Sequence, residues 1–169
     1  MSGLLESFPP IASANSHTLI LGSMPGIKSL QANQYYAHPR NLFWPFISEL
    51  LKFDLSLSYE ERIIKLKEND IALWDVLQHC HRQGSLDSDI RKDSMVPNDF
   101  AGFLKQHRSI RHIFFNGKKS EEVFRRNVMK TIQADFPDIR YTGLPSTSPA
   151  NASIKREEKF RQWKQVLSS

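Results

Sequence analysis

The sequence predicts an α/β fold with three layers, α/β/α, around a central four-stranded parallel sheet. Two observations support this prediction. Four short apolar segments are flanked by Gly, Pro or Asn, as buried parallel strands often are, and helical patterns lie between them. Strands that alternate with helices form a parallel sheet covered on both faces. The predicted strands cover residues 17–21, 71–77, 110–115 and 139–142.

The helices are predicted from apolar residues at helical spacing. One of them has an N-terminal signature, because Ser58 is followed three residues later by Glu61, as in a capping box. The predicted helices cover residues 41–52, a segment that starts at Ser58, and residues 98–106, 121–132 and 153–167. A chain of this length is expected to form one domain, residues 1–169. Its ligand site is expected beyond the carboxyl ends of the strands.

The composition limits the class of protein. The chain is 40% hydrophobic and 24% charged, and it has no apolar run near the roughly 20 residues of a membrane span. Its first residues lack the basic start of a secretory signal. The single cysteine, Cys80, excludes an intrachain disulfide framework. We therefore expect a cytoplasmic protein, nucleoid-associated if its source is prokaryotic, with no membrane partner.

Two segments near the first predicted strand carry the residues of interest. The strand runs into GSMPG (residues 22–26), and a polar and aromatic segment, QYYAHPRNLFW (residues 34–44), leads into the next helix. A turn followed by an ordinary helix start is the simpler interpretation. The density of Tyr, His, Arg and Asn in the second segment favours a functional role instead.

These segments resemble motifs of the uracil-DNA glycosylase superfamily. GSMPG resembles its first motif, and GLPSTSPAN (residues 143–151) resembles its second. AHPRNLFW (residues 37–44) is similar to a segment of mismatch-specific uracil glycosylases, and with Tyr35 and Tyr36 ahead of it resembles the hypoxanthine (deoxyinosine) DNA glycosylase branch. WDVL (residues 74–77) and GSLDS (residues 84–88) lie between the motifs as in that branch. The resemblance implies a uracil-DNA glycosylase-like fold and a monofunctional repair enzyme that removes a deaminated base from DNA.

The resemblance also implies a catalytic residue. Many relatives have Asp or Asn before the proline of the first motif, where it holds the attacking water, whereas this chain has Met24. A thioether accepts hydrogen bonds poorly. Asn41 is our choice for holding the water, since its carbonyl oxygen can position it. His38 is the alternative, because an imidazole can act as a base. No cofactor is expected.

The base-binding site is expected to involve both motif segments and the end of the third predicted strand. Tyr35 or Tyr36 can stack on a flipped base, although packing in the core is equally plausible for each. Asn116 offers a donor and an acceptor that match uracil and hypoxanthine alike, or it is a turn residue before glycine. The predicted base-binding residues are Gly22, Ser23, Met24, Tyr35, Tyr36, His38 and Asn116.

DNA is the expected partner, and a net charge of +5 is compatible with it. Leu144 and Pro145 are predicted as wedge residues that enter the duplex where the base leaves; a proline-rich loop without contacts is the alternative. The other predicted DNA-binding residues are Ser146, Thr147, Ser148, Asn151, Lys118 and Lys119. Lys155, Arg156 and Arg161 are further phosphate candidates, unless they form a solvated helix face.

Several other interpretations remain. The adjacent residues His79, Cys80 and His81 point in different directions in a strand or helix, so no metal site is expected. Aspartates are predicted to cap helices rather than serve the site: Asp75, Asp87 and Asp89. Alternative functions are a mismatch-specific uracil enzyme, an inactive DNA-binding module, and an esterase that uses Ser23. A monomer is expected.

Overall fold

The computed structural model describes residues 4–168. Its central sheet has four parallel strands in the order β3-β2-β6-β7, which confirms the predicted sheet. Every residue of the first three strands in this order is buried, as expected for a sheet covered on both faces. The strands are β2 (Thr18–Gly22), β3 (Ile71–Asp75), β6 (His112–Asn116) and β7 (Arg140–Leu144).

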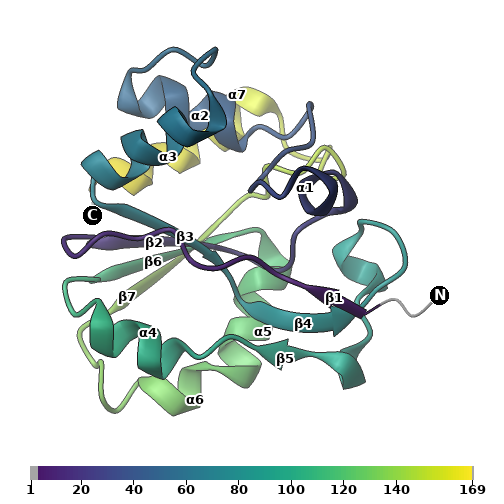
Figure 1. Ribbon diagram of the computed structural model, residues 1–169, viewed down its shortest axis with the longest axis vertical. Coiled ribbons are helices and arrows are strands. Elements are labelled where there is room, and N and C mark those ends of the chain that lie inside the picture. Colours follow the sequence, from purple (N-terminus) through teal and green to yellow (C-terminus); the bar gives the residue numbers. More distant parts are fainter. Residues whose placement is uncertain (1–3, 169) are drawn as a thin grey trace.

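Helices cover both faces of this sheet, so the predicted three layers are confirmed (Figure 1). Side chains alternate between the faces along each strand. Ile20 packs in the cluster that contains Trp163, whereas Leu21 packs in the cluster that contains Phe124. One face carries α2 (Phe43–Leu51), α3 (Tyr59–Glu68) and α7 (Arg156–Trp163). The other carries α4 (Phe100–Gln106), α5 (Lys118–Asn127) and α6 (Met129–Ile132).

Two of the predicted elements are interrupted. The strand expected over residues 71–77 ends at Asp75, and residues 77–81 instead form a strand of a second sheet that pairs with residues 4–6. The helix expected over residues 121–132 breaks at Val128. The predicted capping box at Ser58 is confirmed, with both of its hydrogen bonds to Glu61 present.

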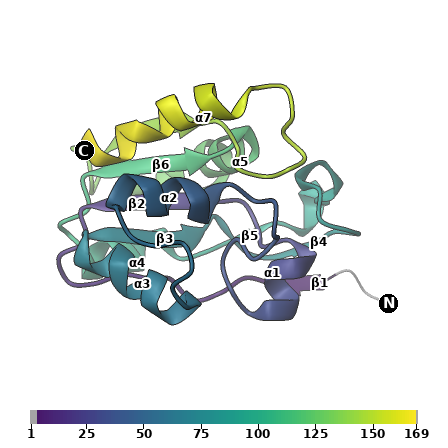
Figure 2. The same ribbon diagram turned by 90° about the horizontal axis from the view of Figure 1, so that it is seen from above.

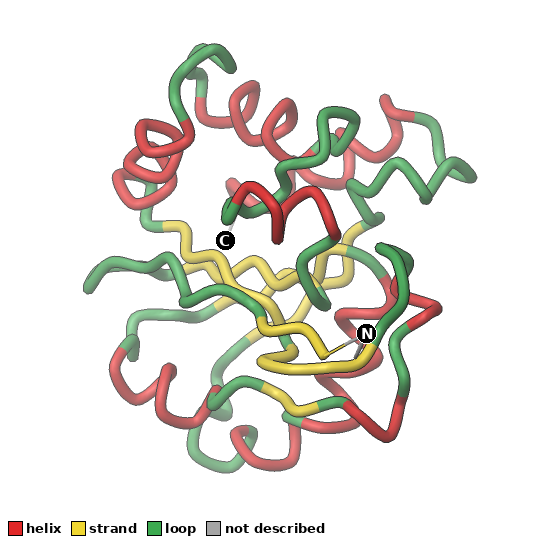
Figure 3. The backbone as a smooth tube through the Cα atoms, turned by 45° about the vertical axis from the view of Figure 1, so that its right-hand side comes forward, coloured by secondary structure: helices red, strands yellow, loops and turns green. Residues whose placement is uncertain are grey.

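A second, antiparallel sheet was not predicted. It has the order β1-β4-β5 and joins segments far apart in the sequence. Figure 2 shows β1, β4 and the unpredicted helix α1 at one end of the molecule, and Figure 3 shows the strands of both sheets enclosed by helices and loops. These elements are β1 (Leu4–Glu6), β4 (Leu77–His81), β5 (Val96–Pro97), α1 (Ile27–Ala32), and three 3-10 helices: η1 (Asp87–Asp89), η2 (Lys92–Ser94) and η3 (Lys164–Ser168). Within residues 4–168, no helix is long and apolar enough to cross a membrane.

Candidate active site

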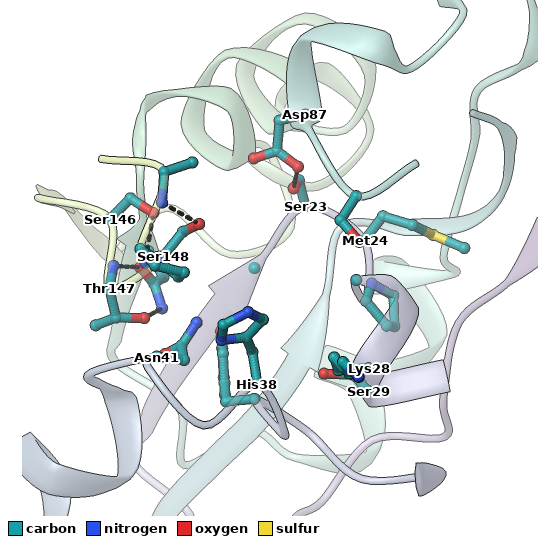
Figure 4. Close-up of a pocket in the computed structure, with 18 of the residues that line it drawn as sticks. Ser23, Met24, Lys28, Ser29, His38, Asn41, Asp87, Ser146, Thr147 and Ser148 are labelled. Atoms are coloured by element: carbon teal, nitrogen blue, oxygen red, sulfur yellow. Dashed lines mark hydrogen bonds between the residues drawn. The ribbon is translucent and has the colours of Figure 1, made fainter. Parts of the chain in front are cut away.

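A pocket of about 690 Å³ opens at the carboxyl ends of the central strands. The last residues of three neighbouring strands line it, namely Gly22 of β2, Asp75 of β3 and Asn116 of β6. The remaining walls come from the loops after β2, β4 and β7, the start of α1 and the segment that leads into α2 (Figure 4). The pocket therefore lies where open parallel sheets place their ligands.

The loop after β2 fits closely against its neighbours. A Cβ atom on Gly22 would lie 2.6 Å from Asp75 Oδ1 and 3.0 Å from Tyr36 Oη, so this position requires glycine. Ser23 Oγ donates a hydrogen bond of 2.6 Å to Asp87 Oδ1, not to the histidine that an esterase nucleophile needs. Met24 lines the pocket but packs in the core, with 7% of its surface exposed. Its sulfur offers no strong acceptor for a water.

Asn41 lines the pocket on the segment that enters α2, near His38 (Figure 4). Its side-chain oxygen accepts a hydrogen bond of 2.9 Å from the Phe43 N–H. The backbone N–H of Asn41 donates to the His38 carbonyl. The first contact fixes the orientation of the amide. One lone pair of the oxygen and both amide hydrogens are left for other partners. The geometry is suited to holding a water in a set position.

His38 is held in a state that suits donation rather than proton abstraction. The backbone N–H of Arg40 donates to His38 Nδ1 at 3.0 Å. Because Nδ1 accepts this bond, the neutral ring carries its hydrogen on Nε2. A water could lose its proton to this ring only after the contact with Arg40 had been given up. This geometry favours Asn41 over His38 for the water.

The two tyrosines have different surroundings. Tyr35 is 4% exposed, and its hydroxyl donates to the Pro9 carbonyl at 2.8 Å, so this ring serves the core. Tyr36 has a positive φ of 55° and stacks on Phe43 with 4.2 Å between ring centroids. Strained backbone of this kind is often found at functional sites. Tyr36 is therefore the tyrosine that we retain for base stacking, and Tyr35 has a packing role.

Asn116 fixes the second motif next to the segment that enters α2. Its amide nitrogen donates to Thr147 Oγ1, and its oxygen accepts from the Thr147 N–H, each at 2.9 Å. The carbonyl of Thr147 in turn accepts from the Leu42 N–H at 3.0 Å. Each polar atom of the Asn116 side chain thus makes one hydrogen bond that fixes the second motif against the entry to α2, which leaves one amide hydrogen and one lone pair for other partners. Base recognition by Asn116 stays a prediction.

The second motif borders the pocket only in part. Ser146, Thr147, Ser148 and Asn151 line it, and Figure 4 shows Ser146 to Ser148 on one side of the pocket. Leu144 is 4% exposed and packs in the core as the last residue of β7. The wedge role predicted for Leu144 does not fit this buried position.

The neighbouring Pro145 is half-buried, and its carbonyl accepts a hydrogen bond of 2.9 Å from Trp163 Nε1. This contact ties the loop to α7. Pro145 is not among the residues that line the pocket.

The basic residues divide into free and paired groups. Lys118 is exposed and Lys119 half-buried at the start of α5, and Lys155 is exposed ahead of α7. Arg156 lies over the Phe46 ring, 5.7 Å from its centroid. Arg161 is paired with Glu158, which makes it a poor phosphate candidate. Lys28, which the sequence did not single out, is exposed at the edge of the pocket.

Two of the three aspartates expected to cap helices line the pocket instead, namely Asp75 and Asp87. Asp75 is 3% exposed, and its Oδ2 is buried without a hydrogen-bond partner among the described residues. Burial, reinforced by the charge of Asp87 and opposed by Arg82, raises the pKa of Asp75 to about 7. Burial also raises the pKa of Asp87, opposed by the hydrogen bond from Ser23. The expectation of helix caps was therefore wrong for these two residues.

Arg82 was also missed by the sequence analysis. It is 3% exposed, and it donates to the carbonyls of Pro25 and Gly84 at 2.6 and 2.7 Å. Arg82 thereby holds the first-motif loop against the loop after β4. No sequence signal marks it, since its partners are backbone carbonyls and one of them, that of Pro25, lies far along the chain. Asp75 has a signal: like Gly22 and Asn116, it directly ends a buried strand.

The His79, Cys80 and His81 segment forms part of β4. Cys80 is buried in the core, whereas His79 and His81 line a separate shallow pocket on the outside of the small sheet. This alternation is the one expected along a strand. The described residues contain no group of three or more His, Cys, Asp or Glu side chains placed to hold a metal ion.

Comparisons with known proteins identify similar sequences and a similar fold. The family model described as "Uracil DNA glycosylase superfamily" matches residues 9–168. A hypoxanthine DNA glycosylase of Methanosarcina barkeri is 39% identical over 118 residues, 69% of this chain and 73% of its own. One of Methanosarcina acetivorans is 34% identical over 168 residues, 96% of this chain and 97% of its own. A solution NMR structure from M. acetivorans, provisionally described as a uracil DNA glycosylase, has a TM-score of 0.77 at 30% identity, covering 96% of this chain and 98% of that one.

The fold, the pocket and these matches define a DNA glycosylase, an enzyme that hydrolyses the bond between a base and its sugar in DNA repair. The chain belongs to the uracil DNA glycosylase superfamily. The resemblance seen in the two sequence motifs is thereby confirmed.

Proposed function

We propose that this protein removes hypoxanthine from DNA and leaves an abasic site. The main observation in support is that residues of the YYAHPRN segment (residues 35–41) and of the second motif line the same pocket. Relatives named hypoxanthine DNA glycosylase, at 39% and 34% identity, support the choice of base. We further propose that residues 1–169 act as one domain, as a monomer and without a cofactor, in the cytoplasm and on the nucleoid of a prokaryotic source.

The proposed reaction begins when the damaged nucleotide leaves the stack and enters the pocket. Tyr36 stacks on the base, and Asn41 holds a water near C1′ of the sugar. The C1′–N9 bond breaks, its electron pair leaves with the base, and the water oxygen bonds to C1′. The water gives up one proton and the departing base takes one up, so the products are neutral hypoxanthine and an abasic site. Backbone N–H groups of residues 22–26 are suited to stabilising the departing base.

The proposal predicts cleavage at deoxyinosine under single-turnover conditions. Duplexes with one deoxyinosine, one deoxyuridine or no lesion are incubated with excess protein, and abasic sites are then cut with alkali. We expect strand breaks with deoxyinosine and none in the undamaged duplex. Release of uracil without any release of hypoxanthine would show that the choice of base is wrong.

Uracil is the second candidate substrate. Its O4 and N3–H present the same acceptor and donor as O6 and N1–H of hypoxanthine, and one of the similar structures was provisionally described as a uracil enzyme. The same assay compares the two lesions directly. Tight binding to both lesion duplexes without cleavage of either would instead identify an inactive DNA-binding module.

A further inference from the structure

Asp75 has an unusual environment for a carboxyl group that lines a pocket. Its side chain is 97% removed from solvent, and Oδ2 has no hydrogen-bond partner among the described residues. The nearby hydroxyl of Tyr36 is also buried without a partner. Buried polar atoms of folded proteins are nearly always hydrogen bonded, so two such atoms together make this part of the pocket suited to a polar ligand.

The neighbouring strand ends show where that ligand fits. Gly22 pairs with Asp75 in the sheet, and its missing side chain leaves room for Asp75 Oδ1 and Tyr36 Oη. The corresponding polar residue of β6, Asn116, is bound through both of its side-chain polar atoms to Thr147. Asp75 is therefore the strand-end side chain with a buried polar atom that has no hydrogen-bond partner among the described residues.

The charged groups around Asp75 favour its neutral form. Arg82, after β4, is the cation that faces it, but Arg82 also faces Asp87 of η1 and is bonded to backbone carbonyls. Asp87 adds a second negative charge, which is itself stabilised by Ser23.

The other titratable neighbours do not reverse this preference. Tyr36 and Tyr35 face Asp75 from the loop before α2 and are neutral, since burial raises the pKa of each hydroxyl. Lys119 of α5 acts on Asp87, and His38 lines the same pocket. With burial as the largest cause, the pKa of Asp75 lies at about 7. A large share of the molecules thus carries a protonated Asp75 near neutral pH.

A protonated carboxyl group has one donor, its O–H, and one acceptor, its carbonyl oxygen. Hypoxanthine presents the complementary pair, O6 as acceptor and N1–H as donor. An ionised carboxylate only accepts, so it would face O6 with no hydrogen between them. We propose that Asp75, in its protonated form, recognises the base through two hydrogen bonds, donating to O6 and accepting from N1–H. This inference rests on the proposed function and adds Asp75 to the residues predicted to recognise the base.

The test compares the pH dependence of single-turnover hypoxanthine release by the wild type, Asp75→Asn and Asp75→Ala. We expect the wild-type rate to fall about tenfold per pH unit above about pH 7, as the protonated form is lost. Asp75→Asn should stay within about threefold of the wild type at pH 6 and lack this fall, because a side-chain amide keeps one donor and one acceptor. Asp75→Ala should be at least tenfold slower at pH 6, since O6 and N1–H lose their partner.

Controls separate the role of Asp75 from other causes. Deoxyinosine itself titrates at alkaline pH and can also change the rate. The pH profile of Asp75→Asn on the same substrate shows this contribution, and the difference from the wild-type profile is due to Asp75. Asp93→Asn removes an exposed carboxylate of η2 and should keep the wild-type profile. NMR titration of the side-chain carboxyl carbon of Asp75 in the free protein gives a readout without activity, and a midpoint near pH 7 is expected.

Three results would overturn the proposal: a profile of Asp75→Asn that falls like that of the wild type, a carboxyl midpoint below pH 5, or an Asp75→Ala variant that is folded by circular dichroism and as fast as the wild type. If the wild type releases no hypoxanthine at any pH while uracil is released, the proposed function fails first. That outcome differs from the other three, because it concerns which base the wild type releases and not any property of Asp75.

Discussion

Two edges of the pocket, at the ends of β6 and β3, differ in how their buried polar groups are hydrogen bonded. At the end of β6, Asn116 and Thr147 satisfy each other through two hydrogen bonds, and Thr147 also binds the backbone of Leu42. At the end of β3, Asp75 Oδ2 and Tyr36 Oη are buried without partners in the described chain. We call these regions the paired edge and the open edge. The first holds the second motif against the segment that enters α2, and the second has buried polar atoms that can bind a ligand.

The largest effect is expected at the residue that the paired edge supports. Asn41→Ala should lower single-turnover cleavage by roughly 100- to 1,000-fold, the range seen when one preorganised polar group is lost. DNA binding, measured by fluorescence anisotropy, should stay nearly unchanged, since Asn41 acts on the transition state.

Asn41→Asp is the matched control. It keeps an oxygen for the Phe43 N–H, so a loss of activity in Asn41→Ala beyond that of Asn41→Asp is not an effect of the helix start. If Asn41→Ala cleaves at the wild-type rate and His38→Ala does not cleave, His38 and not Asn41 holds the attacking water.

The paired edge itself can be broken with Asn116→Ala. The buried N–H and hydroxyl of Thr147 then lose their partner, which should lower the free energy of unfolding by about 2–4 kcal/mol. Urea denaturation measures this change. Asn127→Ala, which removes a hydrogen bond within α5, should cost less than about 1 kcal/mol. Equal effects of the two substitutions would show that the paired edge has no special role in stability.

The open edge predicts a dependence of stability on pH. The folded protein keeps a proton on Asp75 up to about pH 7, whereas the unfolded chain releases it near pH 4. The contribution of this proton to the free energy of unfolding is therefore complete below about pH 4 and is lost as the pH rises to about 7. Asp75→Asn should remove this pH-dependent loss of stability. At pH 8 it should be more stable than the wild type by a few kcal/mol, since each pKa unit corresponds to about 1.4 kcal/mol.

Thermal unfolding at pH 4 and pH 8 measures the difference, with Asp93→Asn as an exposed control. An Asp75→Asn variant that is no more stable than the wild type at pH 8 would show that ionised Asp75 does not destabilise the fold. The proposed difference between the open edge and the paired edge would then be wrong.

The smallest effect is expected outside both edges, at the start of α5. Lys118→Ala with Lys119→Ala should reduce the slope of log affinity against log salt by up to about two units, since each phosphate contact contributes roughly 0.9. The same double change at Lys65 and Lys67 of α3 removes equal charge away from the pocket and should leave the slope unaltered. An unchanged slope in the first variant would assign its lysines to solvent.

Much of the fold follows from local patterns in the sequence. Apolar runs such as residues 17–21 have few alternatives to a buried strand, and the Ser58 capping box marks a helix start through contacts three residues apart. The small sheet was not predictable in this way, because β1 pairs with β4 across some 70 residues of chain and β5 has two residues. The division of the predicted strand at Val76 likewise depends on the pairing of β4 with β1.

The sequence by itself determined the α/β class, the two motifs and their place at the strand ends, and it singled out Asn41. Only the tertiary structure decided the roles of side chains whose partners lie far along the chain. Leu144 is covered by the core, Asn116 is bound to Thr147, and Asp75 is left with an unpaired oxygen. The physical reason is that burial and hydrogen bonding are set by neighbours in space, whereas helical and strand patterns are set by neighbours in sequence.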